Sequence, residues 1–161
     1  MTTNSKLDTA IDQWMEQNTE DLLQLTEALI RFQSEQHVPT GWEKECQMFV
    51  ADKLRGMNLE LDIFEPSEVP GFSDHPAYWP GRDYRSRPNV VGIWRGTDST
   101  RARSLMFSRH ADVVAGNEGG RFPPFAPVRQ GDKLYGRGSN DMKGGLAASI
   151  MAVRCLQELG V

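Results

Sequence analysis

The helical stretch at the end of the sequence constrains the fold most strongly. Residues 144–160 read GGLAASIMAVRCLQELG and are apolar on nearly every side of a helix. Such a helix has to be covered from more than one direction, whereas an ordinary surface helix buries one stripe. The stretch therefore predicts a helix from about Met142 to Leu159 that packs inside a layered structure.

The sequence stops directly after this helix, at Gly160 and Val161. In an alternating α/β order the element after a helix and its terminal glycine is a strand. We therefore expect residues 1–161 to form an incomplete, N-terminal portion of a single α/β domain, in which a mixed sheet is flanked by helices. On this expectation the last helix leaves an apolar face exposed.

Earlier patterns predict further helices and strands. Apolar residues at spacings near three, four and seven over residues 8–32 predict an amphipathic helix or helix pair. A second helix is expected to start at Thr40, as its cap, and to end at Gly56. Expected strands are LELDIF (59–64), NVVGIW (89–94), SLMFSR (104–109) and KLYG (133–136). The second and third of these strands are predicted to be neighbours joined by the turn RGTDSTRA (95–102).

Two proline- and glycine-rich stretches, residues 66–88 and 115–131, are predicted to be loops. The first contains Phe72, Trp79 and Tyr84, which we interpret as packing residues. Its arginines, at positions 82, 85 and 87, are most simply a solvated face.

Composition limits the classes of function. The chain has 161 residues, 39% of them hydrophobic and 25% charged, as in an ordinary globular protein. Its net charge of −4 gives no electrostatic footprint for nucleic acid or an anionic membrane. The longest apolar stretch, Leu146 to Val153, is far below the roughly 20 residues that span a bilayer. The two cysteines, Cys46 and Cys155, read as buried free thiols, so we expect a cytoplasmic protein.

The segment SRHADVVAG (108–116) places a histidine and an aspartate two positions apart after an apolar run. On a strand, His110 and Asp112 share one face, and a carboxylate beside a metal-binding histidine fixes its tautomer. Taken alone, the pair is equally well explained as a solvent-facing strand end and a turn former.

The segment GRGSNDMKGG (136–145) surrounds Asp141 with glycines, which let the backbone bend sharply and present a carboxylate. Capping the following helix is the simpler role for Asp141 by itself. Two short motifs that each deliver a ligand from a loop after a strand make a joint metal site a stronger hypothesis.

SRHADVV, PPFAP and GDKLYGRGSNDMKGG closely resemble the signature of the acetylornithine deacetylase, succinyl-diaminopimelate desuccinylase and aminoacylase family of zinc metallopeptidases. The match in order and spacing covers roughly residues 88–160. The resemblance implies that His110 binds one Zn²⁺, that Asp141 bridges two Zn²⁺ ions, and that Asp112 orients the histidine as a member of the catalytic site. It further implies a nucleophilic water between the metals, with Co²⁺ or Mn²⁺ able to replace zinc.

The resemblance also implies what the complete enzyme would contain. Its substrate would be an N-acyl amino acid or small peptide, hydrolysed at the amide bond, and it would be a homodimer with a separate lid domain. The general base and the remaining ligands lie beyond Val161 in such enzymes, so the 161-residue chain, lacking the C-terminal half and the lid domain, is expected to be inactive alone. Departures from the pattern, such as Arg109 where a small residue is common and Ala115 where proline is common, affect the substrate rather than the family.

Two other readings are retained. The chain can be a catalytically dead remnant, or an interaction module derived from such an enzyme, whose exposed edge pairs with another chain. It can also be a binding protein without metal, in which Asp141 only caps a helix. His37 and His75 are expected in loops away from the site, and Glu118, Glu35 and Glu68 are the alternatives for a base should the chain be active.

Overall fold

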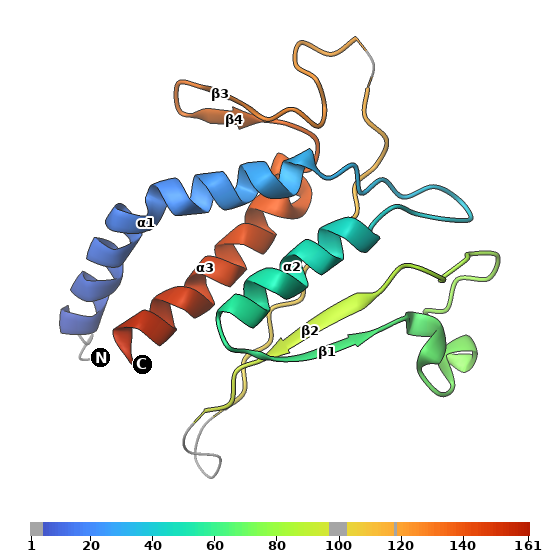
Figure 1. Cartoon of the computed structure of the whole chain (residues 1–161), viewed down its shortest axis with the longest axis horizontal. Coiled ribbons are helices and arrows are strands. Elements are labelled where there is room, and N and C mark those ends of the chain that lie inside the picture. The colour runs from blue at the N-terminus through green and yellow to red at the C-terminus, as the bar shows by residue number, and fades with distance from the viewer. Residues whose placement is uncertain (1–4, 97–102, 118) are drawn as a thin grey trace.

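The computed structural model describes residues 5–96, 103–117 and 119–161, which form three α-helices and two small sheets (Figure 1). The helices are α1 (Ser5–Arg31), α2 (Lys44–Gly56) and α3 (Gly144–Leu159). The strands are β1 (Glu60–Phe64), β2 (Asn89–Ile93), β3 (Val128–Gln130) and β4 (Lys133–Tyr135). The chain is therefore of mixed α and β structure, as predicted.

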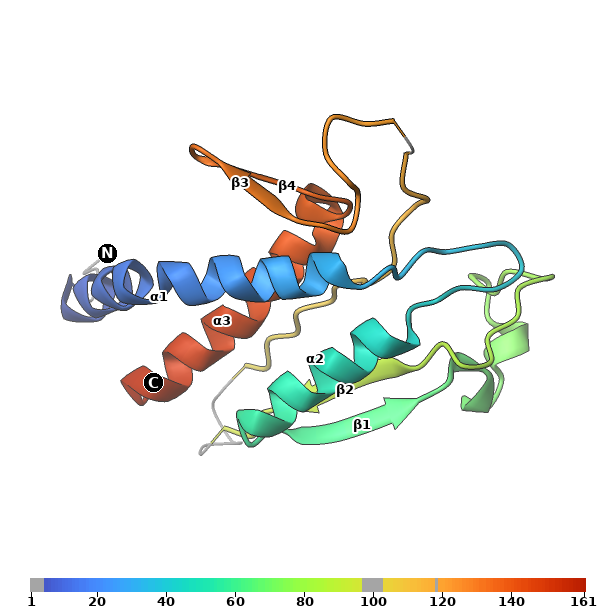
Figure 2. The same cartoon turned by 45° about the horizontal axis from the view of Figure 1, so that its top comes forward.

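The first pattern, over residues 8–32, forms the single helix α1, which runs antiparallel to α3 (Figures 1 and 2). The indole of Trp14 on α1 donates a 2.7 Å hydrogen bond to Glu158 on α3. Trp14 also packs with Met151 and Cys155 of α3 in one buried cluster. The larger cluster joins all three helices and contains Leu29, Cys46, Val50, Ala111, Ala147 and Ile150.

The second helix begins later than predicted, at Lys44. Thr40 does not cap it, because residues 36–41 fold into a tight turn in which the His37 amide donates to the Thr40 carbonyl at 2.9 Å. The N-cap residue is Glu43, whose side chain makes no capping hydrogen bond and instead binds Arg87.

The predicted strands 59–64 and 89–94 are present as β1 and β2, but they pair with each other. They form an antiparallel ladder in which Leu61 lies opposite Gly92 and Ile63 opposite Val90. α2 packs against this ladder at Gly92, where an added Cβ would lie 2.9 Å from Leu54 of that helix. The predicted KLYG strand is β4, which forms a hairpin with β3 through Gly131 at φ +61°.

The predicted strand SLMFSR and the single mixed sheet are not found among the described residues. Residues 103–110 are extended but pair with no strand there, and only Val113 forms an isolated parallel bridge, to Glu35. Most of the expected turn at 95–102 lies outside the described residues. Burial of Ala111 among the helices holds the C-terminal end of this segment.

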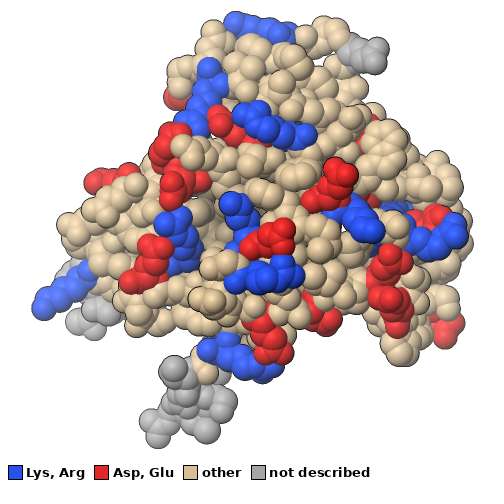
Figure 3. Space-filling model, in the orientation of Figure 1, with Lys and Arg blue, Asp and Glu red and all other residues tan. Residues whose placement is uncertain are grey.

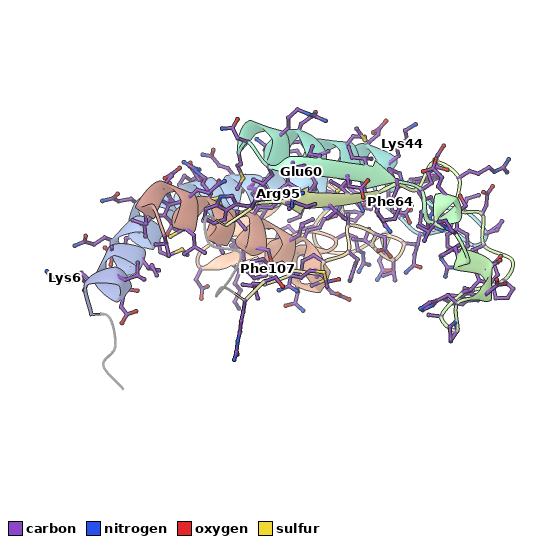
Figure 4. All side chains as sticks on the ribbon, turned by 90° about the horizontal axis from the view of Figure 1, so that it is seen from below. Lys6, Lys44, Glu60, Phe64, Arg95 and Phe107 are labelled. Atoms are coloured by element: carbon purple, nitrogen blue, oxygen red, sulfur yellow. The ribbon has the colours of Figure 1, made fainter. Side chains whose placement is uncertain are left out.

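The last helix does not expose the apolar face that was expected. Its large apolar residues are all buried or half-buried, many of them in the two clusters that include α1 and α2, and none is among the exposed hydrophobic side chains. The exposed apolar residues lie instead on the extended segment, where Leu105 is 77% and Met106 84% accessible. Phe107 is also exposed, on the side of the molecule opposite α2 (Figure 4).

Basic and acidic side chains are intermixed over the visible face in Figure 3. Both cysteines are buried free thiols, as predicted, and burial raises the pKa of each. Within the described ranges, no helix is both long and apolar enough to cross a membrane.

Candidate metal centre

The histidine segment is held in place by the chain that leaves α1. The Val113 amide donates to the Ser34 carbonyl at 2.9 Å, and the Gln36 amide donates to the Val113 carbonyl at 2.9 Å. Alternate residues of an extended chain face opposite sides. Ala111 and Val113 point into the protein, where each is 3% exposed, so His110 and Asp112 point outward together.

The aspartate lies in an irregular turn, η3 (Ser139–Lys143), directly before α3. Gly138 precedes the turn in the left-handed region at φ +81°, and the Lys143 amide closes it by donating to the Gly138 carbonyl at 2.8 Å. Asp141 itself has non-helical backbone angles, φ −128° and ψ 94°, and a cis peptide bond joins it to Met142. α3 begins after this turn without a side-chain cap, so Asp141 is not the helix cap that the simpler reading assigned to it.

The structure brings the two motifs together although they lie 31 positions apart. His110 Nε2 is 3.2 Å from Asp141 Oδ1. On the other side of the ring, His110 Nδ1 is 3.0 Å from the Asp112 carbonyl oxygen and 3.3 Å from Asp112 Oδ1. The imidazole therefore lies between the two aspartates, with 45% of its side chain accessible.

Both ring nitrogens of His110 face oxygen atoms of aspartate residues. The backbone carbonyl of Asp112 can only accept a hydrogen bond, so Nδ1 is the donor in that contact. Nε2 faces the carboxylate oxygen Asp141 Oδ1 at 3.2 Å, and a shared proton or a shared cation would satisfy both atoms.

The donor set fits part of a zinc site. Imidazole nitrogen and carboxylate oxygen are both common zinc ligands, and at about 2.0 to 2.1 Å from a tetrahedral ion two ligands are roughly 3.3 to 3.4 Å apart. The observed 3.2 Å separation agrees with that value. Among residues 5–96, 103–117 and 119–161, however, no cluster of three or more His, Cys, Asp or Glu side chains could hold a metal ion.

The remaining acidic and histidine residues considered from the sequence are engaged elsewhere or are not described. His37 Nε2 lies 3.3 Å from Glu35, and its ring packs on Trp42. Glu35 is buried and accepts a 2.7 Å hydrogen bond from the Gly116 amide. His75 accepts from the Ala77 amide, and Glu68 accepts from the Glu65 amide in a 3₁₀ turn. Glu118 lies outside the described residues.

A shallow pocket opens beside the histidine and is lined in part by Tyr84, Arg87, Arg109, His110 and Asp112. Arg87 was expected on a solvated face, but its side chain is only 15% exposed. It binds the carboxylate of Glu43, which is 8% exposed, through two hydrogen bonds of 2.6 and 3.0 Å. This ion pair joins the start of α2 to the wall of the pocket. The charge pattern of the 66–88 stretch gave no sign of it.

The expected packing role of the aromatic residues is confirmed in part. Phe72 and Tyr84 form an edge-to-face pair with ring centroids 4.8 Å apart. Trp79 is exposed, and the guanidinium of Arg82 lies 4.1 Å from the centroid of its ring.

Two further residues near the site were not singled out from the sequence. Ser34 is buried and its hydroxyl donates to the Ala111 carbonyl at 2.6 Å. Lys143 is fully buried, and its ammonium donates to the Phe32 carbonyl at 2.7 Å. Burial lowers the pKa of Lys143, while nearby Cys46 and Asp112 act in the opposite direction. A lysine between Asp141 and an apolar helix was the one available signal.

The sequence profile of the peptidase family M20/M25/M40 matches residues 106–161, which contain His110, Asp112 and Asp141. N-formyl-4-amino-5-aminomethyl-2-methylpyrimidine deformylase from Bacillus subtilis is 31% identical over 149 residues, which are 91% of this chain and 31% of that protein. Succinyl-diaminopimelate desuccinylase from Burkholderia cenocepacia is 32% identical over 132 residues, 81% of this chain and 29% of that protein. The desuccinylase from Blochmanniella floridana is 30% identical over 139 residues, 83% of this chain and 30% of that protein.

These similarities relate the chain to the metallohydrolases of the peptidase family M20/M25/M40, whose profile matches residues 106–161, and they confirm the resemblance seen in the sequence. The chain spans about a third of the length of the curated relatives that it matches, between 29% and 31%.

Proposed function

We propose that this chain provides part of a zinc centre that hydrolyses the amide bond of N-acyl amino acids or small peptides. The observation that carries the proposal is the 3.2 Å approach of His110 Nε2 to Asp141 Oδ1, two atoms that a shared proton or cation would satisfy. Family members typically use zinc. The names of the matched relatives, a deformylase and desuccinylases, both describe removal of an acyl group.

In this proposal the chain's own residues bind and orient. His110 and Asp141 would hold one zinc ion, and Asp112 would keep the proton on His110 Nδ1 so that Nε2 is free to coordinate. The Asp141 side chain is 83% exposed, which leaves its second oxygen accessible to a second ion. When bound, zinc lowers the pKa of a coordinated water and polarises the carbonyl of the scissile bond.

The described residues do not complete such a centre. A catalytic zinc ion has about three protein ligands, and here one histidine and one aspartate converge. The proposal therefore includes additional ligands and a general base outside the described residues. It retains the hypothesis that residues 1–161 are the N-terminal portion of one catalytic domain in a larger, dimeric enzyme. The 161-residue chain alone would then bind zinc weakly and hydrolyse N-acyl amino acids at no detectable rate.

A second candidate is favoured by one observation. The extended segment around Leu105, Met106 and Phe107 exposes both apolar side chains and backbone that pairs with no strand in the described part of the chain. Exposed strand edges of this kind pair with other chains. A derived interaction module without catalytic activity would use this surface.

Zinc titration of the 161-residue chain tests the first candidate, using competition with a chromophoric chelator. We expect weak binding that is abolished in His110→Ala and strongly reduced in Asp141→Asn. His75→Ala is the matched control, because this exposed ring accepts its hydrogen bond from the Ala77 amide of its own loop, and the variant should bind zinc as the unmodified chain does. Equal binding by the unmodified chain and His110→Ala would overturn the metal proposal and leave the interaction module.

A further inference from the structure

The five residues that leave α1, Phe32 to Gln36, contact both halves of the candidate metal centre. In Figures 1 and 2 this chain crosses the extended histidine segment immediately after α1 ends. Hydrogen bonds from the same five residues reach the segment that carries His110 and the turn that carries Asp141.

The first arm holds the histidine segment. The Ser34 hydroxyl donates to the Ala111 carbonyl at 2.6 Å, and the Ser34 carbonyl accepts from the Val113 amide at 2.9 Å. These contacts flank Asp112 on both sides. Because they are buried and involve the backbone, they fix the direction in which His110 and Asp112 project.

The second arm holds the aspartate turn. Lys143 lies two residues after Asp141 in the sequence. Its ammonium reaches through the protein interior and donates to the Phe32 carbonyl at 2.7 Å. The lysine stem also covers Gly138, since a Cβ there would lie 3.2 Å from Lys143 Cδ and 2.6 Å from Val113 Cγ1. The turn is therefore packed directly against the histidine segment at Gly138.

The arms add directional hydrogen bonds to the apolar packing that joins the two halves at Gly138 and at Ala111. Between Val113 and η3 the chain runs through an irregular stretch and the small β3–β4 hairpin, without forming a common sheet with either half in the described residues. Metal ligands must be held to within about 0.5 Å of their productive positions. A contact that fixes both segments to one short piece of backbone meets that requirement.

We infer that Phe32–Gln36 is a positioning clamp that sets the separation of His110 and Asp141, with Ser34 and Lys143 as its positioning residues. The effect of the clamp on metal binding rests on the proposed function. The contacts of the clamp are present in the metal-free chain and can be measured there.

The metal-free test is hydrogen exchange in the 161-residue chain, read at the arm that was not mutated. Lys143→Met keeps the stem but removes the ammonium, and it should speed exchange of the Val113 amide by about tenfold through increased local opening. Ser34→Ala should similarly speed exchange of the Lys143 amide. Thr26→Val is the control, because the buried Thr26 hydroxyl donates its hydrogen bond within α1, to the Leu22 carbonyl at 2.8 Å. Exchange that changes only at the mutated arm, or equally in the control, would overturn the clamp.

The second measurement is Zn²⁺ affinity of the same variants in a double-mutant cycle. Loss of one outer contact typically weakens a metal site about 10- to 100-fold, and each single variant should show such a loss while Thr26→Val does not. Both arms set one distance, so the double variant should lose less than the product of the two single losses. Losses that multiply would show two independent structural effects and contradict the clamp. If the unmodified chain binds no zinc, the proposed function fails, and the exchange experiment still decides the clamp.

Discussion

Gly138 shows at the scale of one residue why the aspartate turn needs glycine. Its φ of +81° is in the left-handed region, and an added Cβ would lie 2.6 Å from Val113 Cγ1. Gly81 has a similar φ of +83° with nothing within 4 Å of an added Cβ. The two positions therefore separate backbone strain from close packing.

We predict that Gly138→Ala destabilises the chain more than Gly81→Ala does. Both variants incur a left-handed backbone cost of about 1–2 kcal/mol, and only Gly138→Ala adds about 1–3 kcal/mol of overpacking against Val113. Denaturant unfolding of both variants measures the difference. Equal losses would mean that the packing of Gly138 against Val113 does not contribute to stability.

Asp112 provides a second prediction at this scale. Asp112→Ala should weaken zinc binding about 10- to 100-fold without abolishing it, because the residue-112 carbonyl, 3.0 Å from His110 Nδ1, remains. Chelator competition measures the affinity, with the exposed Asp62→Ala on β1 as control. An unchanged affinity would show that the carbonyl alone orients the ring.

At the scale of the element, α2 is anchored by an ion pair rather than by a capping hydrogen bond. Removing one partner of a buried ion pair leaves the other charge unpaired in the interior, which lowers the free energy of unfolding by about 3–5 kcal/mol. Arg87→Met should cause a loss of that order, because Glu43 is left unpaired at 8% exposure. The double variant Glu43→Met/Arg87→Met should be clearly more stable than Arg87→Met. Thermal and denaturant unfolding measure both.

The exposed pair between Arg95 and Glu60, which lies along the β1–β2 ladder (Figure 4), is the matched comparison. Water screens these two side chains, which are 72% and 57% exposed, so Arg95→Met should change stability little. A similar loss in Arg87→Met and Arg95→Met would contradict the role assigned to burial.

Periodicity predicted elements whose apolar pattern marks a buried face, whichever element covers it. The stripe of α1 and the alternation of residues 59–64 therefore gave the right element, although the partner of α1 is the distant helix α3. SLMFSR has the composition of a strand, but a strand also needs a hydrogen-bonding neighbour, and composition does not identify one. The Thr40 cap failed because the turn at 36–41 uses that backbone instead.

The exposed residues of the candidate site could be predicted from the sequence, but the buried residues that hold them in place could not. Both His110 and Asp141 stand in short motifs, so their meeting could be expected. Ser34 and Lys143 act through backbone carbonyls of residues 111 and 32. Every residue type has a backbone carbonyl, so the sequence does not show which residues accept these hydrogen bonds. The buried pair of Glu43 with Arg87 is hidden for a related reason, because burial depends on the whole fold.

For the whole molecule, the exposed apolar segment predicts how the chain behaves in solution. Leu105, Met106 and Phe107 are three consecutive exposed apolar residues, and exposed apolar surface promotes association. We predict that Leu105→Ser/Met106→Ser reduces hydrophobic-dye binding and self-association, with little change in unfolding free energy because both side chains are already exposed. Dye fluorescence and analytical ultracentrifugation measure these effects, with the exposed Val69→Ser as control. Unchanged association would assign it to another surface.

The two arms of the clamp also determine when the site can form during synthesis of the chain. The Ser34–Ala111 contact closes 77 positions of sequence, and the Phe32–Lys143 contact closes 111. Such long closures become available only after both ends have left the ribosome, and they are entropically more demanding than local helix formation. α1 can therefore be complete while its C-terminal extension still waits for its partners, and the candidate metal centre cannot be positioned until residue 143 has emerged.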